Sequence, residues 1–536
     1  MHNAGLGSWP ERRLMMTPER DAIWFEGTTV SHGEFAFRVR RVAAALAGLG
    51  VGPGDRVAWF SANHPSALET LYACGQLGAI WVPVNARLTS DEVEYILTHS
   101  GASAVVLGAE QAVHAGDLLQ RAPAVRSWIT IEPPGGHATA ARGILSYERL
   151  LGEAQAVPRD EPVSLDDPCL IMYTSGTTGR PKGAVLTHGN MTWNAVNQLL
   201  GFDLTPEERT LALAPLFHIG GLNGTVNPTL LRGGCAVIVR RFDPAATLDI
   251  IVQQRINSFF AVPAMLDAMA REPGFATADL SALRTVAAAG APLPLPTLRT
   301  WLARGMTVQQ AYGMTEAAPG CTVLDSADAE RKAGSAGKPV FFTDLQVIRP
   351  DGTGAAPDEV GEVIVSGPNI MAGYWQEPGR TAEVLVDGWY HTGDAGSLDT
   401  EGFLYIRDRY KDMIISGGEN VYPAEVESAL LELPGVLEAA VIGVPDEQWG
   451  EVGLAILVTS PDGPGDPGVF TAALRERLAG FKVPRHFRFA AALPKTATGK
   501  IRKADLRAQF SDLGTQSAVL EVEHCGRREP ADGASR

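Results

Sequence analysis

Short apolar runs alternate with amphipathic helical patterns from Asp21 to about Gly290. Ser31–Gly50 is predicted to be a helix, capped at its start by Ser31 and ended by Gly50, and Arg56–Phe60 a strand. Strands separated by helices form parallel sheets with crossover helices, so the fold class is α/β. The same alternation predicts further elements at His64–Gly78, Ile80–Pro83, Asp91–Thr98, Ala104–Leu107, Thr210–Ala214, Ala236–Val239, Ala245–Arg255 and Phe259–Val262.

The pattern changes after Lys338. Strand patterns at Leu345–Arg349 and Val360–Ser366 flank the turn-rich sequence P-D-G-T-G. Two strands joined through such a turn favour an antiparallel pairing. We therefore expect a smaller antiparallel sheet, or a β-barrel-like part, at the end of the large domain.

A charged segment, R-D-R-Y-K-D, separates this region from a second pattern that is long enough for an α+β domain. Its predicted elements are Met413–Ser416, Pro423–Leu433, Glu438–Val444, Gly453–Val458 and Val469–Leu478. We place the boundary at Asp408–Lys411. The predicted domains are thus residues 1–408 and 409–513, followed by a polar tail at 514–536 that is expected to be disordered.

Tyr173–Gly183, with the sequence Y-T-S-G-T-T-G-R-P-K-G, follows a strand-like apolar run and precedes another at Ala184–Leu186. Its glycines allow a backbone in which successive N–H groups point into one concavity. Hydroxyl groups and the ammonium group of Lys182 add donors and positive charge. The stretch is therefore suited to hold a polyphosphate.

This stretch differs from the P-loop of kinases and GTPases, which requires G-K-[ST] at the start of a helix. Here Pro181 precedes Lys182, and a strand pattern follows it. A flexible surface loop is the alternative interpretation, because clusters of Gly, Ser and Thr often form one.

Composition restricts the remaining possibilities. A chain of 536 residues is expected to form two or more domains, and its net charge of −16 argues against binding nucleic acid or anionic membranes. We find no signal-peptide pattern and no apolar run of membrane-spanning length. Five scattered cysteines without C-x-x-C spacing indicate neither a disulfide framework nor a zinc site, which favours a cytoplasmic location.

Six further motifs follow the glycine-rich loop in a fixed order. They are P-L-F-H-I-G-G (215–221), A-G-A-P-L-P (289–294), Q-A-Y-G-M-T-E (310–316), G-W-Y-H-T-G-D (388–394), S-G-G-E-N-V-Y-P (416–423) and L-P-K-T-A-T-G-K-I (493–501). In this order and spacing the chain resembles the adenylate-forming superfamily of acyl- and aryl-CoA synthetases, luciferases and peptide-synthetase adenylation domains. The resemblance implies Mg²⁺-dependent formation of an acyl-adenylate from ATP and a small-molecule carboxylic acid, followed by thioester formation with coenzyme A.

The resemblance also implies an ATP site. Tyr312 would stack on adenine, Asp394 would accept the ribose hydroxyls, and Glu316 would hold Mg²⁺, which prefers hard oxygen ligands. Thr315 would bond the α-phosphate. The residues assigned to ATP or AMP are Thr174, Ser175, Gly176, Thr177, Thr178, Gly179, Lys182, Gly290, Ala291, Pro292, Gln310, Tyr312, Gly313, Met314, Thr315, Asp394, Arg409 and Lys500.

Catalytic roles follow from the same resemblance. Lys500 matches the lysine of the adenylation step, and His218 would close the acid pocket near the carboxylate. Thr315 and Glu316 complete the catalytic set. The small domain would rotate about a hinge at Lys411 between the two half-reactions, bringing forward a loop for the thiol of coenzyme A that contains Gly417, Gly418 and Glu419.

The acid remains open between an alkyl chain and a planar phenylpropenoid, because the candidate pocket residues are mostly apolar and several are small. Segments of the chain are similar to both bacterial feruloyl-CoA synthetases and bacterial fatty-acyl-CoA synthetases. The candidate pocket residues are Phe217, Leu222, Asn223, Val262, Met265, Ala288, Met314 and Ala317.

Three alternatives accompany this interpretation. One is a stand-alone enzyme that loads a carrier protein, although no carrier-like segment follows Lys503. Another is luciferase-type oxidation. The third is a nucleotide-binding module that has lost catalysis, although Lys500, Glu316 and Asp394 are all present. A homodimer is compatible with the sequence.

Overall fold

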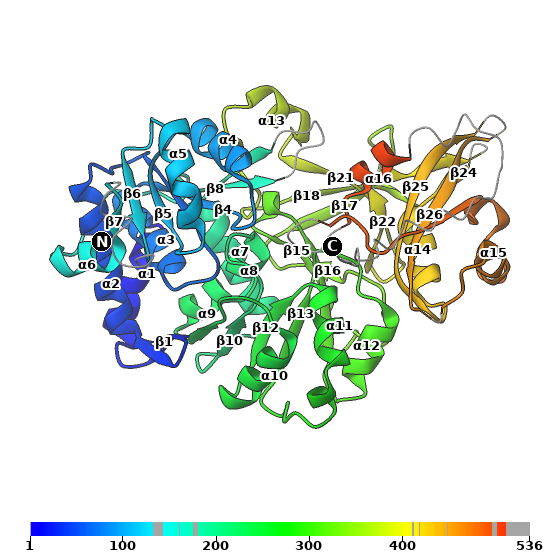
Figure 1. Ribbon diagram of the computed structural model, residues 1–536, viewed down its shortest axis with the longest axis horizontal. Coiled ribbons are helices and arrows are strands. Elements are labelled where there is room, and N and C mark those ends of the chain that lie inside the picture. The colour runs from blue at the N-terminus through cyan, green and yellow to red at the C-terminus, as the bar shows by residue number, and fades with distance from the viewer. Residues whose placement is uncertain are drawn as a thin grey trace, which may run out of the picture. The chain divides into compact units, whose positions relative to one another are not determined.

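The computed structural model describes residues 2–131, 143–159, 161–174, 181–409, 412–416, 419–446, 449–461, 463–495 and 501–510 (Figure 1). The chain divides into two compact units, and the division lies between the described residues Arg409 and Asp412. The polar tail at 514–536 lies outside the described residues.

The first unit contains an eight-stranded sheet with the order β19-β9-β8-β4-β3-β5-β6-β7. Strands from β8 to β7 are parallel, whereas β9 and β19 run antiparallel at one edge. The bounds are β3 (Arg56–Phe60), β4 (Ile80–Val84), β5 (Ala102–Leu107), β6 (Ser127–Thr130), β7 (Leu145–Ser146), β8 (Pro168–Thr174), β9 (Lys182–Thr187) and β19 (Gly373–Tyr374).

A nine-stranded sheet follows the order β16-β15-β14-β13-β12-β10-β11-β1-β2 and is parallel from β14 to β1. At the two edges the pairing is antiparallel, between β1 and β2 and among β14, β15 and β16. The bounds are β1 (Asp21–Phe25), β2 (Thr28–Ser31), β10 (Arg209–Ala212), β11 (Cys235–Ile238), β12 (Ser258–Ala261), β13 (Thr285–Ala288), β14 (Val308–Gly313), β15 (Gly320–Val323) and β16 (Lys338–Pro339).

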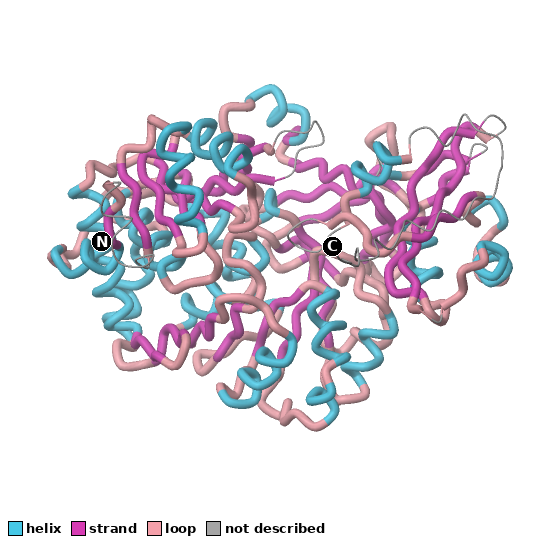
Figure 2. Tube along the Cα trace, in the orientation of Figure 1, coloured by secondary structure: helices cyan, strands magenta, loops and turns pink. Residues whose placement is uncertain are grey.

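Helices pack against these sheets (Figure 2), as the alternating pattern predicts. Among the described residues, every helix is too short or too polar to cross a membrane. Helix α2 begins with a complete capping box, in which Ser31 Oγ accepts from Glu34 N and Glu34 Oε2 accepts from Ser31 N. The bounds are α1 (Trp9–Met16), α2 (His32–Gly48), α3 (Ser66–Leu77), α4 (Ser90–Ser100), α5 (Ala115–Arg121), α6 (Tyr147–Glu153), α7 (His188–Gly201), α8 (Ile219–Asn223), α9 (Val226–Arg232), α10 (Pro244–Gln253), α11 (Pro263–Arg271), α12 (Leu295–Leu302) and α13 (Pro378–Val384).

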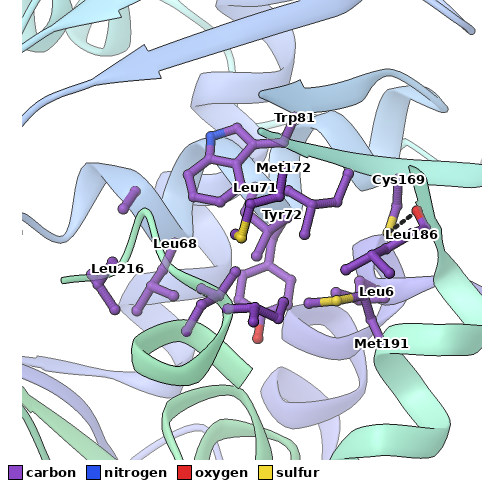
Figure 3. Packing of buried hydrophobic residues seen from close by; sticks show 14 of the residues in the cluster. Leu6, Leu68, Leu71, Tyr72, Trp81, Cys169, Met172, Leu186, Met191 and Leu216 are labelled. Carbon is purple, nitrogen blue, oxygen red and sulfur yellow. Dashed lines mark hydrogen bonds between the residues drawn. The ribbon is translucent and has the colours of Figure 1, made fainter. Parts of the chain in front are cut away.

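The largest hydrophobic core joins side chains of both sheets, and helix α3, which is buried over its whole length, lies in it. Leu68, Leu71 and Tyr72 of α3 pack beside Trp81 of β4 and Met172 of β8 (Figure 3). Burial of this many large apolar side chains fixes the two sheets relative to each other. The strand ends that carry the motifs are therefore held on a rigid support.

The third sheet of this unit is antiparallel, with the order β17-β18-β21-β20, and β22 also pairs with β21. It corresponds to the smaller antiparallel sheet predicted after Lys338. The bounds are β17 (Asp344–Ile348), β18 (Gly361–Ser366), β20 (Leu385–Val386), β21 (Trp389–Leu398) and β22 (Leu404–Arg409).

The second unit has its own five-stranded sheet and helices, which confirms the predicted α+β character. Successive residues of β25 face opposite sides, so that Val441 lies in one hydrophobic cluster and Ile442 in another. The bounds are β23 (Ile414–Ser416), β24 (Glu419–Val421), α14 (Pro423–Leu431), β25 (Val436–Asp446), β26 (Gly450–Thr459), α15 (Pro467–Arg475), β27 (His486–Phe489) and α16 (Lys503–Gln509).

Two buried histidines should make the first unit sensitive to acid. Burial lowers the pKa of both His32 and His188 from 6.5 to about 4. The imidazole of His188 accepts the N–H of Leu6 through Nδ1 at 3.1 Å. The unfolded chain binds a proton at each histidine near pH 6.5 and the folded chain only near pH 4, so stability should fall as the pH falls through that window.

The expected loss is at most about 1.4 kcal/mol per pH unit for each histidine. Urea unfolding at pH 7.5, 6 and 5 measures it. His188→Asn keeps an acceptor for Leu6 but removes the titrating ring, so the variant should show a shallower pH dependence than the wild type. Equal slopes for the two proteins would contradict the assignment to His188.

Candidate active site

Four neighbouring parallel strands bring the sequence motifs to one edge of the nine-stranded sheet. In the order β14-β13-β12-β10, each strand ends at this edge. The segments beyond their carboxyl ends contain Met314–Glu316, Gly290–Pro292, Val262 and Pro215–His218. Ligands of open α/β sheets bind in the crevice outside the carboxyl ends of the strands. Segments far apart in sequence thus meet where this fold class places its ligands.

His218 lies in this region, directly before helix α8. Its ring makes an edge contact with Phe217 at a centroid distance of 4.7 Å, and its Nε2 has no hydrogen-bond partner among the described residues. Burial lowers the pKa of His218 to about 4, and the nearby Arg87 adds to the effect. The imidazole is therefore neutral at pH 7, with one polar atom available to a ligand.

Tyr312 and Asp394 come together from two different sheets. Tyr312 lies on β14, and its hydroxyl donates to Asp394 Oδ2 on β21 at 2.7 Å. Burial raises the pKa of Tyr312 well above its usual value, and the negative charge of Asp394 raises it further. The phenol stays protonated at neutral pH, so the flat ring is held next to a carboxylate that is 7% exposed.

Glu316 follows β14 and is 7% exposed. Its Oε1 lies 3.2 Å from the ammonium nitrogen of Lys182 and accepts the hydroxyl of Tyr374 at 2.8 Å. Lys182 also donates to the Tyr374 hydroxyl. In the structure, the positive charge that the sequence placed at Lys182 is paired with the Glu316 carboxylate. The base of the glycine-rich loop is thus joined to the segment that follows β14.

Buried amide side chains hold the turn that carries Thr315 and Glu316. Asn369 donates to the carbonyls of Ala317 and Gly320 at 2.9 and 2.8 Å. Asn194 accepts the N–H of Gly320 at 2.9 Å. Both asparagines are fully buried. These contacts fix the backbone beside Glu316, because a buried amide left without its partners would be costly.

Sequence reasoning missed Asn194, Asn369 and Tyr374 as contributors to this site. One signal was available for Asn194. It belongs to a series of amide residues on one face of α7, namely Asn190, Asn194, Asn197 and Gln198, all buried. Amide groups repeated at helical spacing among apolar residues indicate a buried hydrogen-bond network. Nothing local marks Asn369 or Tyr374.

The candidate acid-pocket residues differ in accessibility. Val262, Met265 and Met314 are partly exposed, whereas Phe217, Leu222, Asn223, Ala288 and Ala317 are buried. Asn223 donates to the carbonyls of Ala318 at 2.7 Å and Met191 at 3.3 Å. Its Oδ1 has no hydrogen-bond partner among the described residues. Asn223 therefore supports the same turn as Asn369 and retains one acceptor.

Several predicted site residues lie outside the described residues, namely Ser175, Gly176, Thr177, Thr178, Gly179, Lys411, Gly417, Gly418 and Lys500. Thr174 ends β8 and pairs with Lys182 at the start of β9, so the two ends of the glycine-rich loop are adjacent. Arg409 ends β22 and Glu419 begins β24. Gln310 and Gly313 lie on β14 with Tyr312, and Gly290, Ala291 and Pro292 follow β13.

The residues fit a magnesium ion that is bound together with a nucleotide. Among the described residues no group of three His, Cys, Asp or Glu side chains could hold a metal alone. Mg²⁺ usually keeps several waters and is bound by one or two carboxylates plus substrate phosphates. Glu316 supplies one such carboxylate, next to the base of the loop suited to phosphates.

Comparison with known proteins agrees with this geometry. Residues 10–375 match the AMP-binding enzyme family, and residues 425–500 match the AMP-binding enzyme C-terminal domain. A feruloyl-CoA synthase of Amycolatopsis sp is 48% identical over 510 residues, covering 95% of this chain and 100% of the relative. A long-chain-fatty-acid–CoA ligase, FadD13 of Mycobacterium tuberculosis, is 38% identical and covers 94% of this chain and 98% of the relative.

Among solved structures, ATP-bound MatB from Rhodopseudomonas palustris superimposes with a TM-score of 0.88 at 31% identity, covering 96% of this chain and 100% of that chain. The first family match alone spans more than half of the sequence, from residue 10 to residue 375. The resemblance seen in the motifs is confirmed. The chain belongs to the AMP-binding enzyme family, in its branch of acyl- and aryl-CoA synthetases.

Proposed function

We propose that this enzyme activates a hydroxycinnamate-type acid such as ferulate with Mg-ATP, and then transfers the acyl group to coenzyme A. The observation that carries this proposal is the 48% identity to a feruloyl-CoA synthase over that relative's whole length. A fatty acid is the second candidate substrate, supported by the 38% identity to a long-chain-fatty-acid–CoA ligase.

The site offers chemistry that suits a phenolic acid. Its candidate lining is apolar, with Val262, Met265 and Met314 partly exposed at the strand ends. Asn223 adds one buried carbonyl oxygen without a partner among the described residues. A phenol hydroxyl is a donor that could satisfy it, and a site built to bond a hydroxyl discriminates strongly against substrates that lack one. An alkyl chain would leave that acceptor unpaired.

The first half-reaction is governed by charge. The substrate carboxylate attacks an α-phosphate that is itself anionic, so catalysis depends on positive groups and oriented donors more than on a base. Mg²⁺, when bound, would neutralise phosphate charge, and Glu316 is the residue that would hold it. Lys182 would reach the β- and γ-phosphates, Thr315 the α-phosphate, and Lys500 the reacting oxygens of acid and phosphate.

The remaining residues position the substrates. Tyr312 would stack its ring on adenine while its hydroxyl stays on Asp394, and Asp394 would also accept the ribose hydroxyls. His218 is neutral at pH 7 because burial lowers its pKa to about 4, so it can stand near the acid without forming an ion pair with it. In the second half-reaction, the thiol of coenzyme A displaces AMP from the acyl-adenylate, with Gly417–Glu419 lining its approach.

A panel of acids tests the substrate. CoA-thioester formation would be measured with Mg-ATP and with ferulate, coumarate, cinnamate, benzoates, and fatty acids from short to long. We expect kcat/KM for ferulate and coumarate to exceed that for cinnamate by at least about tenfold, because cinnamate lacks the hydroxyl that Asn223 would bond.

The other results have distinct meanings. Activity that rises with alkyl chain length would replace the hydroxycinnamate proposal with the fatty-acid one. Release of AMP without any thioester would show that the acceptor is not coenzyme A, and loading of a carrier protein would then be the function to test.

A further inference from the structure

Tyr374 lies on β19, outside the sequence motifs, yet its phenol contacts two residues of the phosphate and metal region. The β19 strand pairs with β9, with Tyr374 opposite Ala184. The hydroxyl of Tyr374 donates to Glu316 Oε1 at 2.8 Å and accepts from Lys182. The ammonium nitrogen of Lys182 also lies 4.1 Å from the centroid of the tyrosine ring.

The chemistry of a phenol suits this double contact. A hydroxyl can donate one hydrogen bond and accept another, so it can bond a carboxylate and an ammonium group together. Tyr374 is 4% exposed, and burial beside Glu316 raises its pKa above the usual value. The hydroxyl thus remains a donor throughout the range in which an enzyme works. A second phenol, that of Tyr390, lies 3.4 Å from it.

The ammonium group of Lys182 lies beside Glu316, where the metal ion would bind. Its ammonium nitrogen is 3.2 Å from Glu316 Oε1, where a Mg²⁺ ion bound to that carboxylate would also place positive charge. A Mg²⁺ ion on Glu316 would repel the ammonium group of Lys182 and weaken its pairing with the carboxylate. Arrival of Mg-ATP would therefore favour departure of Lys182 from Glu316 toward the phosphates.

We propose that Tyr374 is a positioning residue that seats Lys182 on Glu316 before nucleotide binds and keeps the Glu316 carboxylate oriented once Mg²⁺ replaces the lysine. The inference rests on the proposed function, in which Glu316 holds the metal. Tyr374 remains bonded to Glu316 in both states. When Mg²⁺ takes the place of Lys182 at Glu316, Lys182 is released and can contact the phosphates.

The test is the Mg²⁺ dependence of ATP binding to Tyr374→Phe, measured by calorimetry without acid substrate so that no turnover occurs. Phenylalanine keeps the ring beneath Lys182 and removes the hydroxyl alone. Because a hydrogen bond to a charged group is lost, we expect the half-saturating Mg²⁺ concentration for tight ATP binding to rise about tenfold. Binding of ATP without Mg²⁺ should change less than about twofold, since Lys182 keeps its pairing with Glu316 and its contact with the ring when the hydroxyl is removed.

Tyr147→Phe is the matched control. The Tyr147 hydroxyl donates to Glu69 Oε2 at 2.8 Å, and Glu69 is a buried carboxylate that is paired with Arg38. The control removes the same chemical group from the same kind of contact, at a carboxylate with no proposed part in the site. It should match Tyr374→Phe in any general loss of stability while keeping the Mg²⁺ dependence of the wild type.

A double-mutant cycle with Glu316→Gln separates positioning from a merely structural role. If Tyr374 acts through Glu316, adding Tyr374→Phe to Glu316→Gln should leave the Mg²⁺ dependence unchanged. An unaltered Mg²⁺ dependence in the single variant, or a full further shift in the double variant, would overturn the proposal. Failure of the wild type to bind ATP, or binding with no Mg²⁺ dependence, would instead overturn the proposed function.

Discussion

Replacing Glu316 with glutamine is expected to lower the rate of acyl-adenylate formation by about 10²–10³, the loss typical of one oriented electrostatic group. Glutamine has nearly the same shape and can still accept from Tyr374, which donates to Oε1 at 2.8 Å. It lacks the charge that Mg²⁺ and Lys182 require. ATP–pyrophosphate exchange, dependent on the acid, measures this half-reaction alone.

Glu69→Gln is the control for the general effect of neutralising a buried carboxylate. Glu69 is also a buried carboxylate, and it accepts from Tyr147 and pairs with Arg38. Because the buried carboxylate loses its charge beside the half-buried Arg38, the control should lose about 1–3 kcal/mol of stability while exchange per folded molecule stays near normal. Equal loss of exchange in both variants would show that Glu316 has only a structural role.

The local patterns of the sequence predict most of the fold. The strand expected at Arg56–Phe60 has those bounds in the structure, and the helix expected to begin after Ser31 begins at His32. Apolar periodicity and capping residues act over a few neighbouring positions, so they can be read without tertiary information. Sheet order cannot be read in this way. The placement of β1 between β2 and β11, for example, depends on pairing across the chain.

The same distinction explains what the sequence revealed of the site. Tyr312, Glu316 and Asp394 lie in motifs with a recognisable order, and in the structure all three contact a residue of a different sheet. Tyr374 has no such signal. Its contact with Lys182 joins positions 192 residues apart and exists only because the short β19 strand pairs with β9 at the sheet edge. A tyrosine of this kind would ordinarily be assigned to the core.

Buried amides give a second example. Asn223 is a polar residue among apolar pocket candidates, and such a residue suggests contact with a ring hydroxyl. The structure shows that its amide nitrogen is used for the carbonyls of Ala318 and Met191. Whether a polar side chain bonds the backbone or a ligand depends on tertiary contacts, and these cannot be read from the sequence. The side-chain oxygen of Asn223 has no partner among the described residues, so the acid panel still tests whether Asn223 bonds the substrate.

Replacing Lys500 with alanine is expected to separate the two half-reactions. Lys500 lies outside the described residues, so the prediction rests on its motif, T-G-K-I at 498–501, and on the charge argument. The attacking carboxylate and the α-phosphate are both anionic, and removal of the cation proposed to bridge them should lower acyl-adenylate formation by about 10²–10³. Thiol attack on a finished acyl-adenylate needs no such bridge, because the acid is already joined to the α-phosphate as a mixed anhydride and no longer carries its negative charge.

Two assays distinguish these steps, one for ATP–pyrophosphate exchange and one for thioester formation from supplied acyl-adenylate and coenzyme A. Lys500→Ala should lose the first activity and keep the second within about threefold, since only the first step brings two anions together. Lys503→Ala is the control, because it removes a nearby lysine that pairs with Glu427 at 2.9 Å inside the second unit. The control should retain both activities. Equal loss of both half-reactions in Lys500→Ala would contradict a role for this lysine that is specific to the adenylation step.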